Sequence, residues 1–390
     1  MAIKISRLGQ AKAGRVEKLA TTPLIQGTVT TPVFSNFAAT AARNGEGNLH
    51  VAVWHVAKDG IPTLRSERVE GAISEVAVTS NVNRVVAAMR DGAGKLRLIA
   101  YKVSNDGAKL TRLGTATGRK IESVQVSLSA ALGNAQFVTA SRLPSGAVEV
   151  SFWSLGENGE FASPVDIQLG KATNLGIACG LLGALLAGRT ESGLLRIRAL
   201  RGIGFAAGSA TGPKIFQVSV SSDAERWYVG TINEPRASVR TGLGGLSGRL
   251  ILDTGTMQIS RWDFEGDAAQ SDLVRVAHGE LEGIGAIAFE IKVLAYAPIV
   301  ITVLSGVDTF EKLLEKDRGK PKMRVVVWDS RGDQLVKATH AVSGGKHTQL
   351  AIARLADTPP ISTNSGRFLT AARDNAGRLK LAVWKVIDTD

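Results

Sequence analysis

Short runs of alternating apolar and polar residues follow one another along the whole chain. Between residues 84 and 107 they read "RVVAAMR", "DGAG", "KLRLIAYKV" and "SNDG", so that β-rich runs alternate with turns of Gly, Asn, Asp and Ser. A period of two predicts strands with one buried face, and such turns favour antiparallel hairpins. The pattern therefore predicts an all-β chain.

The same arrangement of runs and turns recurs along the sequence. In five segments an Arg is followed four residues later by Gly, and seven residues after that by Trp, Tyr or Leu. These triplets are Arg43/Gly47/Trp54, Arg90/Gly94/Tyr101, Arg142/Gly146/Trp153, Arg189/Gly193/Leu200 and Arg373/Gly377/Trp384. Two further segments keep part of the marker, as Gly255 with Trp262 and as Trp328 alone. The marker positions 54, 101, 153, 200, 262, 328 and 384 define seven repeat units, numbered 1 to 7.

Each unit contains four predicted strands, and seven such units predict a seven-bladed β-propeller in a single domain, 1–390. Unit 7 lacks a fourth strand at its end. The first residues supply one, because "IKISRLGQA" (3–11) matches "AKLTRLGTA" (108–116) of unit 2. We therefore expect unit 7 to consist of about 346–390 plus 2–11, which removes an open sheet edge.

The repeat resembles that of WD40-type and related seven-bladed propellers, because its third-strand Trp stands where those repeats carry Trp-Asp. The resemblance covers the whole chain; the Gly-His signature is absent, and Trp328-Asp329 matches the Trp-Asp signature. The units are also similar to bacterial propellers with "RDGxGxLxLxxW" repeats. Both resemblances imply an architecture and no particular activity.

The innermost strand of most units has an apolar–small–apolar core, such as Val76-Ala77-Val78. Since successive side chains point to opposite faces, we expect the small residues to form the waist of a central channel. The predicted waist residues are Thr30, Ala77, Ser127, Ala178, Ser219, Ala288 and Ala351.

Polar residues precede this core on the same face, toward the strand starts. The predicted ligand-binding residues are Gln26, Thr28, Ser123, Gln125, Asn174, Gln217 and Gln349, with Lys120 and Lys214 in the loops that enter the inner strands. Convergent polar groups in a concavity favour a ligand site. A channel filled only with water is the alternative.

The formal net charge of +12 favours anionic partners. Nucleic acid is disfavoured, because three Tyr and scattered Trp offer no stacking platform. We therefore expect a basic, ligand-binding repeat protein whose polar funnel takes an anionic or polyhydroxylated small molecule or glycan, such as an acidic glycan. This would be carbohydrate binding without catalysis.

Two alternatives stay open. The protein could be a lyase or hydrolase on an acidic substrate, with Glu75 and His347 as the acid/base pair. It could instead be a protein–protein interaction scaffold, whose partner binds the inserted loops 234–254 and 305–321, the second with a short helix at 308–316. The sequence does not decide whether the protein is an enzyme.

The repeated Arg residues allow two interpretations. They could form a crescent of guanidinium groups that binds carboxylate or phosphate. The structural interpretation is favoured, because a residue repeated in every plain unit is what packing between units predicts. In it, each side-chain stem packs between units and bonds backbone carbonyls at the turn.

The sequence contains no motif for a nucleotide, a metal, a disulfide or a membrane span. The stretches "GLGGLSG" (242–248) and "SGGKHT" (343–348) depart from nucleotide-binding loops, and His278 and His340 lack a third ligand, so no metal or cofactor is expected. Cys179 alone excludes an intramolecular disulfide. The apolar runs at 177–188 and 293–304 are shorter than the roughly 18 residues of a membrane span. The N-terminus lacks a signal-peptide core, so we expect a soluble protein; its compartment stays open, since a leader could have been removed.

Overall fold

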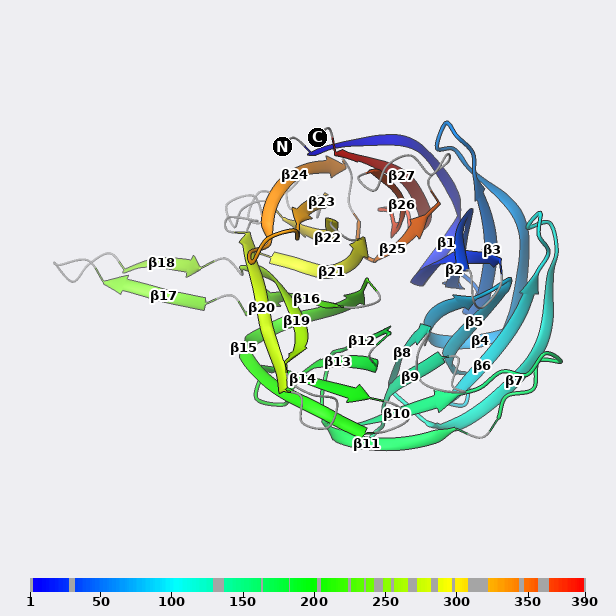
Figure 1. The fold of residues 1–390 in the computed structure, drawn as a ribbon, viewed down its shortest axis with the longest axis horizontal. Helices are drawn as coiled ribbons and strands as arrows, with labels where there is room; N and C mark the ends of the chain where they lie inside the picture. The colour runs from blue at the N-terminus through cyan, green and yellow to red at the C-terminus, as the bar shows by residue number, and fades with distance from the viewer. Residues whose placement is uncertain are drawn as a thin grey trace.

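A computed structural model describes residues 3–27, 32–128, 137–162, 164–181, 183–201, 205–223, 226–234, 236–241, 248–253, 256–265, 272–281, 287–296, 299–307, 322–343, 347–356 and 365–388. These residues form antiparallel sheets arranged around a common centre (Figure 1). The described residues include no helix, and hence none that could span a membrane. The predicted helix at 308–316 and the predicted waist residue Thr30 lie outside the described residues.

Each sequence unit supplies four neighbouring strands, which follow one another from the centre outward. Units 1 to 3 comprise β1 (Ile3–Gly27), β2 (Pro32–Asn44), β3 (Asn48–Val56), β4 (Pro62–Asn81), β5 (Arg84–Asp91), β6 (Lys95–Val103), β7 (Leu110–Lys120), β8 (Ser123–Leu128), β9 (Phe137–Arg142), β10 (Ala147–Trp153) and β11 (Val165–Lys171). Units 4 and 5 comprise β12 (Leu175–Gly180), β13 (Gly183–Arg189), β14 (Leu194–Arg201), β15 (Phe205–Ser222), β16 (Trp227–Asn233), β19 (Met257–Glu265) and β20 (Asp272–Leu281). Units 6 and 7 comprise β21 (Ile287–Tyr296), β22 (Ile299–Val307), β23 (Lys322–Asp329), β24 (Val336–Ser343), β25 (Leu350–Leu355), β26 (Ser365–Arg373) and β27 (Arg378–Asp388).

Three long strands serve two units each. The first half of β4 is the outer strand of unit 1 and its second half the inner strand of unit 2, and β15 joins units 4 and 5 in the same way. The strand β1 pairs with β27 from Ile3 to Arg15 and with β2 from Val16 to Gly27. The first residues of the chain therefore lie beside the last strand (Figure 1).

The predicted loop 234–254 contains a hairpin of its own. The strands β17 (Arg236–Thr241) and β18 (Gly248–Asp253) pair antiparallel and project away from the ring of sheets (Figure 1).

A close backbone approach explains why the N-terminus resembles the fourth strand of unit 2. A Cβ atom at Gly9 would lie 2.5 Å from the carbonyl oxygen of Gly60, and one at Gly114 would overlap that of Gly159. Both glycines follow the same Arg-Leu pair, at a register shift of an outer strand. Only a residue without a side chain fits there, so the shared "RLG" marks where an outer strand touches the next unit.

The hydrophobic core lies between neighbouring units. Val51 and Val53 of unit 1 pack with Ile99 and Tyr101 of unit 2 in one buried cluster, and similar clusters fill the other junctions. Tyr101 is fully buried, and this burial raises the pKa of its hydroxyl well above the ordinary range. Each unit is thus stabilised mainly by its two neighbours.

The marker Trp side chains are held by a hydroxyl. In four units the indole Nε1 donates to a Thr Oγ1 on the second strand, at 2.9–3.0 Å, in the pairs Trp54–Thr40, Trp153–Thr139, Trp328–Thr302 and Trp384–Thr370. In unit 5 Ser260 accepts from Trp262 at 2.8 Å instead. A buried indole N–H needs such a partner. The sequence interpretation missed this Thr, although it stands 14 residues before the Trp in three units.

The repeated Arg and Gly together bind one residue of the next unit. The carbonyl of Gly94 accepts from the Ile121 N–H at 2.9 Å, and Arg90 Nε donates to the carbonyl of the same Ile121 at 2.7 Å. We call this two-point contact the Arg–Gly clasp, and it also joins Arg43 and Gly47 to Ile73, Arg189 and Gly193 to Ile215, and Arg373 and Gly377 to Val16. In unit 3 the Gly146 carbonyl accepts from Ala172 at 3.1 Å, whereas Arg142 Nε has no partner among the described residues.

The other end of each guanidinium group contacts its own unit. Its Nη1 atom binds the residue at the start of the inner strand, in the pairs Arg43–Glu17, Arg90–Ser74, Arg142–Glu122, Arg189–Thr173 and Arg373–Thr348. The glycine must be small, because a Cβ at Gly94 would lie 3.1 Å from Arg90 Nη2, and its φ is +76°. These contacts confirm the structural interpretation of the repeated Arg residues.

We expect the substitution Arg90→Ala to lower the free energy of unfolding by about 2 kcal/mol, because it leaves a buried carbonyl at Ile121 without its charged donor. Urea titration followed by circular dichroism measures this change. Lys102→Ala removes an exposed cation from the same unit and should change the value by less than about 0.5 kcal/mol. Equal effects of the two substitutions would contradict a structural role for the clasp.

Candidate functional site

The inner strands meet at a central channel whose waist is defined by their pairing. In the five units with the repeated Arg, one inner-strand residue lies opposite the second-strand residue two positions before that Arg, as Ala77 lies opposite Ala88. In units 5 and 6, Ser219 and Lys292 hold the equivalent place, because each lies two residues after the residue that follows the register shift of its inner strand. These residues all line one cavity of about 190 Å³, and they are Ala20, Ala77, Gln125, Gly176, Ser219, Lys292 and Ala351.

The structure corrects part of the predicted waist. Ala77, Ser219 and Ala351 lie there as predicted, but Gln125 replaces Ser127, Gly176 replaces Ala178, Lys292 replaces Ala288 and Ala20 takes the place assigned to Thr30. A shift by an even number of residues keeps every side chain on its original face, so the apolar–small–apolar pattern cannot detect it.

Lys292 changes the chemistry of the channel. It is partly buried on β21 and is the charged member of a waist otherwise made of Ala, Gly, Ser and Gln. Gln125 from β8 and Ser219 from β15 are the other polar side chains of the same ring. An ammonium group in a narrow space attracts a negatively charged or strongly polar occupant.

The next residues toward the strand starts are largely engaged with the protein. Lys18 Nζ lies 2.7 Å from Glu75 Oε1, so the predicted catalytic carboxylate is ion-paired. Asn174 Nδ2 donates to the Phe216 carbonyl at 2.8 Å, which joins unit 4 to unit 5. Gln349 Oε1 is buried and has no partner among the described residues.

The remaining predicted residues are placed as follows. His347 is 1% exposed, and its carbonyl accepts from Ser305 Oγ. Ser123 and Gln217 are partly buried on β8 and β15, and Lys120 and Lys214 are exposed just before the inner strands. The Gln26 side chain and Thr28 lie outside the described residues. Among the predicted site residues whose side chains the structure describes, Gln125 is the one that lines the waist cavity.

A wider cavity of about 550 Å³ opens where the inner strands end, opposite to the predicted funnel. Its hydroxyl groups hold neighbouring inner strands together. Ser127 Oγ accepts from the Cys179 N–H at 3.0 Å, and Ser221 Oγ accepts from the Ala295 N–H at 3.0 Å. Asp223 and Arg354 add charges of both signs to its lining. The sequence interpretation missed this mouth, because it followed polar residues only toward the strand starts.

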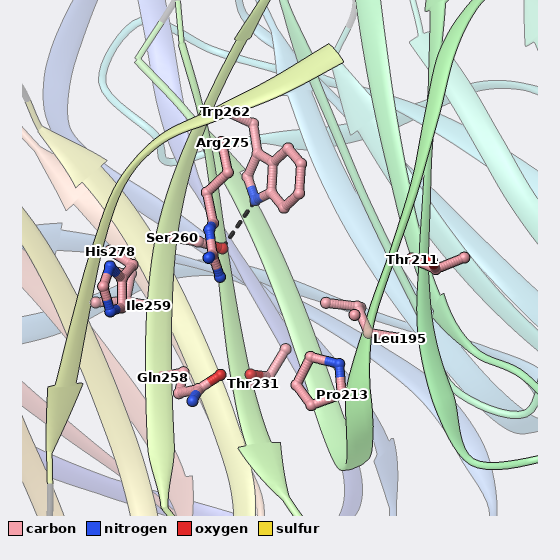
Figure 2. A pocket seen from close by; sticks show the side chains of 11 residues that line it. Leu195, Thr211, Pro213, Thr231, Gln258, Ile259, Ser260, Trp262, Arg275 and His278 are labelled. Atoms are coloured by element: carbon pink, nitrogen blue, oxygen red, sulfur yellow. Dashed lines mark hydrogen bonds between the residues drawn. The ribbon is translucent and has the colours of Figure 1, made fainter.

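A separate cavity of about 420 Å³ lies between units 4 and 5, away from the channel (Figure 2). Leu195, Thr211 and Pro213 line it from unit 4. The opposite wall belongs to unit 5, with Arg275 and His278 on β20 (Figure 2) and the buried Thr231, Ser260 and Trp262. We call this space the 4/5 junction cavity.

Comparison with known structures supports the architecture. The chain is similar to the crystal structure of the WD40 domain of Toxoplasma gondii coronin, with a TM-score of 0.57 and 12% sequence identity over 100% of this chain and 87% of that chain. The protein therefore has the all-β fold of a WD40-like propeller. No protein-family model matches the chain, and no curated protein matches it in sequence.

The Cys179 thiol lines the mouth cavity, and burial raises its pKa to about 12. At about pH 8 we expect this thiol to react with a disulfide reagent roughly a thousandfold more slowly than free cysteine, because so little thiolate is present. Absorbance of the released thiolate measures the rate, and the denatured protein is the control. A native rate equal to the denatured one would contradict the placement of Cys179.

Proposed function

We propose that the protein is a non-catalytic binding propeller whose central channel takes an anionic or polyhydroxylated ligand such as an acidic glycan. The observation that carries this proposal is Lys292 in the channel waist, which Gln125 and Ser219 also line. An ammonium group offers a charge-assisted hydrogen bond to a carboxylate or sulfate. The amide of Gln125 can both donate to and accept from sugar hydroxyl groups.

The electrostatics of the whole chain support the same class of ligand. The formal net charge of +12 attracts anions to the molecule before they reach the channel. Inside the channel, low-dielectric walls strengthen the attraction between Lys292 and an anion. The waist cavity of about 190 Å³ and the mouth cavity of about 550 Å³ share lining residues. This narrow channel with a wider mouth suits the end of a glycan chain better than a bulky group.

The catalytic alternative draws no support from this geometry. Glu75 is held by Lys18, and His347 is 1% exposed, so a substrate in the channel would not meet this pair as free acid and base. The proposed function therefore rests on binding alone.

We further propose that the units are seven blades of one closed propeller, with the N-terminal strand completing the last blade in a single domain. Two contacts support this arrangement. Ile3 to Arg15 pair with β27, and Arg373 and Gly377 of unit 7 clasp Val16 at the start of unit 1. Closure of this kind leaves no unpaired edge between the first and last units.

If the ring is closed in this way, unit 7 meets unit 1 as any unit meets the next. We expect Arg373→Ala and Arg43→Ala to lower the free energy of unfolding by similar amounts, each about 2 kcal/mol. Urea titration of both variants tests this. A much smaller effect of Arg373→Ala would show that the last junction is not a regular one.

We expect Lys292→Ala to weaken binding of a glucuronate-containing oligosaccharide about tenfold or more, because it removes the charged donor of the channel. Isothermal titration at low and raised salt measures the affinity, and Gln125→Ala should cause a smaller loss. Lys102→Ala removes an exposed cation that does not line the channel cavities, and it is the matched control. Absence of binding by any acidic glycan, or equal losses in the two Lys variants, would contradict the proposal.

A further inference from the structure

The 4/5 junction cavity combines an apolar wall with a cationic one. Leu195 and Pro213 of unit 4 face the strands β19 and β20 of unit 5 across the cavity (Figure 2). Arg275 extends from β20 toward Ser260, whose hydroxyl already accepts from Trp262 Nε1 at 2.8 Å (Figure 2). A cavity of about 420 Å³ is within the usual size of small-molecule sites.

Arg275 stands at a position that is cationic in several units, because Arg112, Arg7 and Lys337 lie opposite the marker residues Tyr101, Trp384 and Trp328 in the same way. It has no hydrogen bond or ion pair within the part of the chain that the structure describes. Arg112 of unit 2 occupies the same place, since it pairs with the marker Tyr101 as Arg275 pairs with the marker Trp262. Arg112 lies 3.3 Å from the Glu70 carboxylate. Unlike Arg112, Arg275 has no internal anion beside it, and it lines the 4/5 junction cavity.

The repeat supplies a second comparison, at the junction of units 7 and 1. A cavity of about 770 Å³ lies there between equivalent elements, with Leu379 in the place of Leu195 and Trp54 in the place of Trp262. Strand pairing puts Leu64 in the place of Arg275 and Glu67 in the place of His278. At these two positions the 7/1 junction thus has an apolar side chain and an anion, although Lys12 and Arg15 line its cavity elsewhere, and the 4/5 junction has Arg and His.

Two other polar side chains of the cavity are already hydrogen-bonded to the protein, so Arg275 is the main candidate to bind an anion. Gln258 donates its amide Nε2 to Glu280 at 2.5 Å, so this donor is engaged. Ser260 donates to the Val229 carbonyl at 3.2 Å and accepts from Trp262. Thr211, which is exposed, and Thr231, which is 3% exposed, supply further hydroxyl groups to the lining.

We propose that the 4/5 junction cavity binds a small organic oxyanion, a carboxylate or phosphate carried on an apolar body. The guanidinium of Arg275 binds the oxyanion with paired donors. His278 lies on the same strand and adds a further ring N–H at the cavity. The apolar body packs against Leu195 and Pro213, where water would otherwise cover apolar surface. This site does not depend on the channel ligand.

Phenyl phosphate is the probe for this site, because it joins an oxyanion to an apolar ring. We expect wild-type protein to bind it in isothermal titration, with competition by inorganic phosphate and no binding of phenol. Arg275→Leu, which reproduces the residue of the 7/1 junction, should weaken binding about tenfold or more. Arg275→Gln should have a similar effect and keeps a polar side chain at the surface.

Two matched variants locate the binding. Arg112→Leu removes the equivalent Arg of unit 2, and Lys292→Ala removes the channel cation; both should leave the affinity for phenyl phosphate unchanged. Thermal unfolding checks that each variant is folded. No binding by the wild-type protein, or equal losses in Arg275→Leu and Arg112→Leu, would overturn the proposal. A loss in Lys292→Ala alone would assign the oxyanion to the channel instead.

Discussion

The Arg–Gly clasp is the interaction on which the rest of the structure depends. In one contact, a guanidinium and a glycine carbonyl of one unit bind both backbone groups of a single residue in the next, as Arg90 and Gly94 bind Ile121. The clasped residues Val16, Ile73, Ile121 and Ile215 are nearly fully buried. Since buried backbone groups must be paired, the clasp fixes where the inner strands of units 1, 2, 3 and 5 begin. The position of the inner strand then decides which side chains reach the channel.

The clasp also explains how the repeat tolerates variation. Units 5 and 6 lack the full Arg and Gly marker, and the long insertions of the chain fall in these two units. The hairpin β17–β18 projects from unit 5 without disturbing the strand order of its sheet. Where the clasp is present the connections stay short, and where it is absent the second-to-third strand connection carries extra chain. These two units are held to their neighbours by hydrophobic clusters that span the junctions between units.

Sequence patterns predicted the fold class and the unit boundaries, because Arg, Gly and Trp each occupy a position whose contacts only that residue type can make. Gly94 lies against Arg90 Nη2, and Trp54 needs the Thr40 hydroxyl. The channel residues were predicted less well. Along an inner strand such as Ser123–Leu128, polar or small residues recur every two positions, and sliding by two leaves the pattern unchanged. Pairing partners resolve this ambiguity, and they brought Lys292 into the waist.

The cavity at the 4/5 junction could not be predicted, because it requires residues from two units whose contact the sequence does not show. Arg275 and Leu195 lie far apart in the chain, and neither belongs to a motif. Both proposed sites combine a backbone position that the repeat fixes with a charged side chain. Lys292 stands in a channel ring whose other members are Ala, Gly, Ser and Gln, and Arg275 lines a cavity between two units.

Native-state hydrogen exchange at the clasped amides tests the central claim most directly. The N–H groups of Val16, Ile73, Ile121 and Ile215 each donate to a glycine carbonyl of the preceding unit. If the clasp organises the fold, these amides exchange only through global unfolding, as slowly as the amides at the centre of the sheets. Exchange at the rate of the exposed turn amides, with the sheets still protected, would show that units are held by side-chain packing alone.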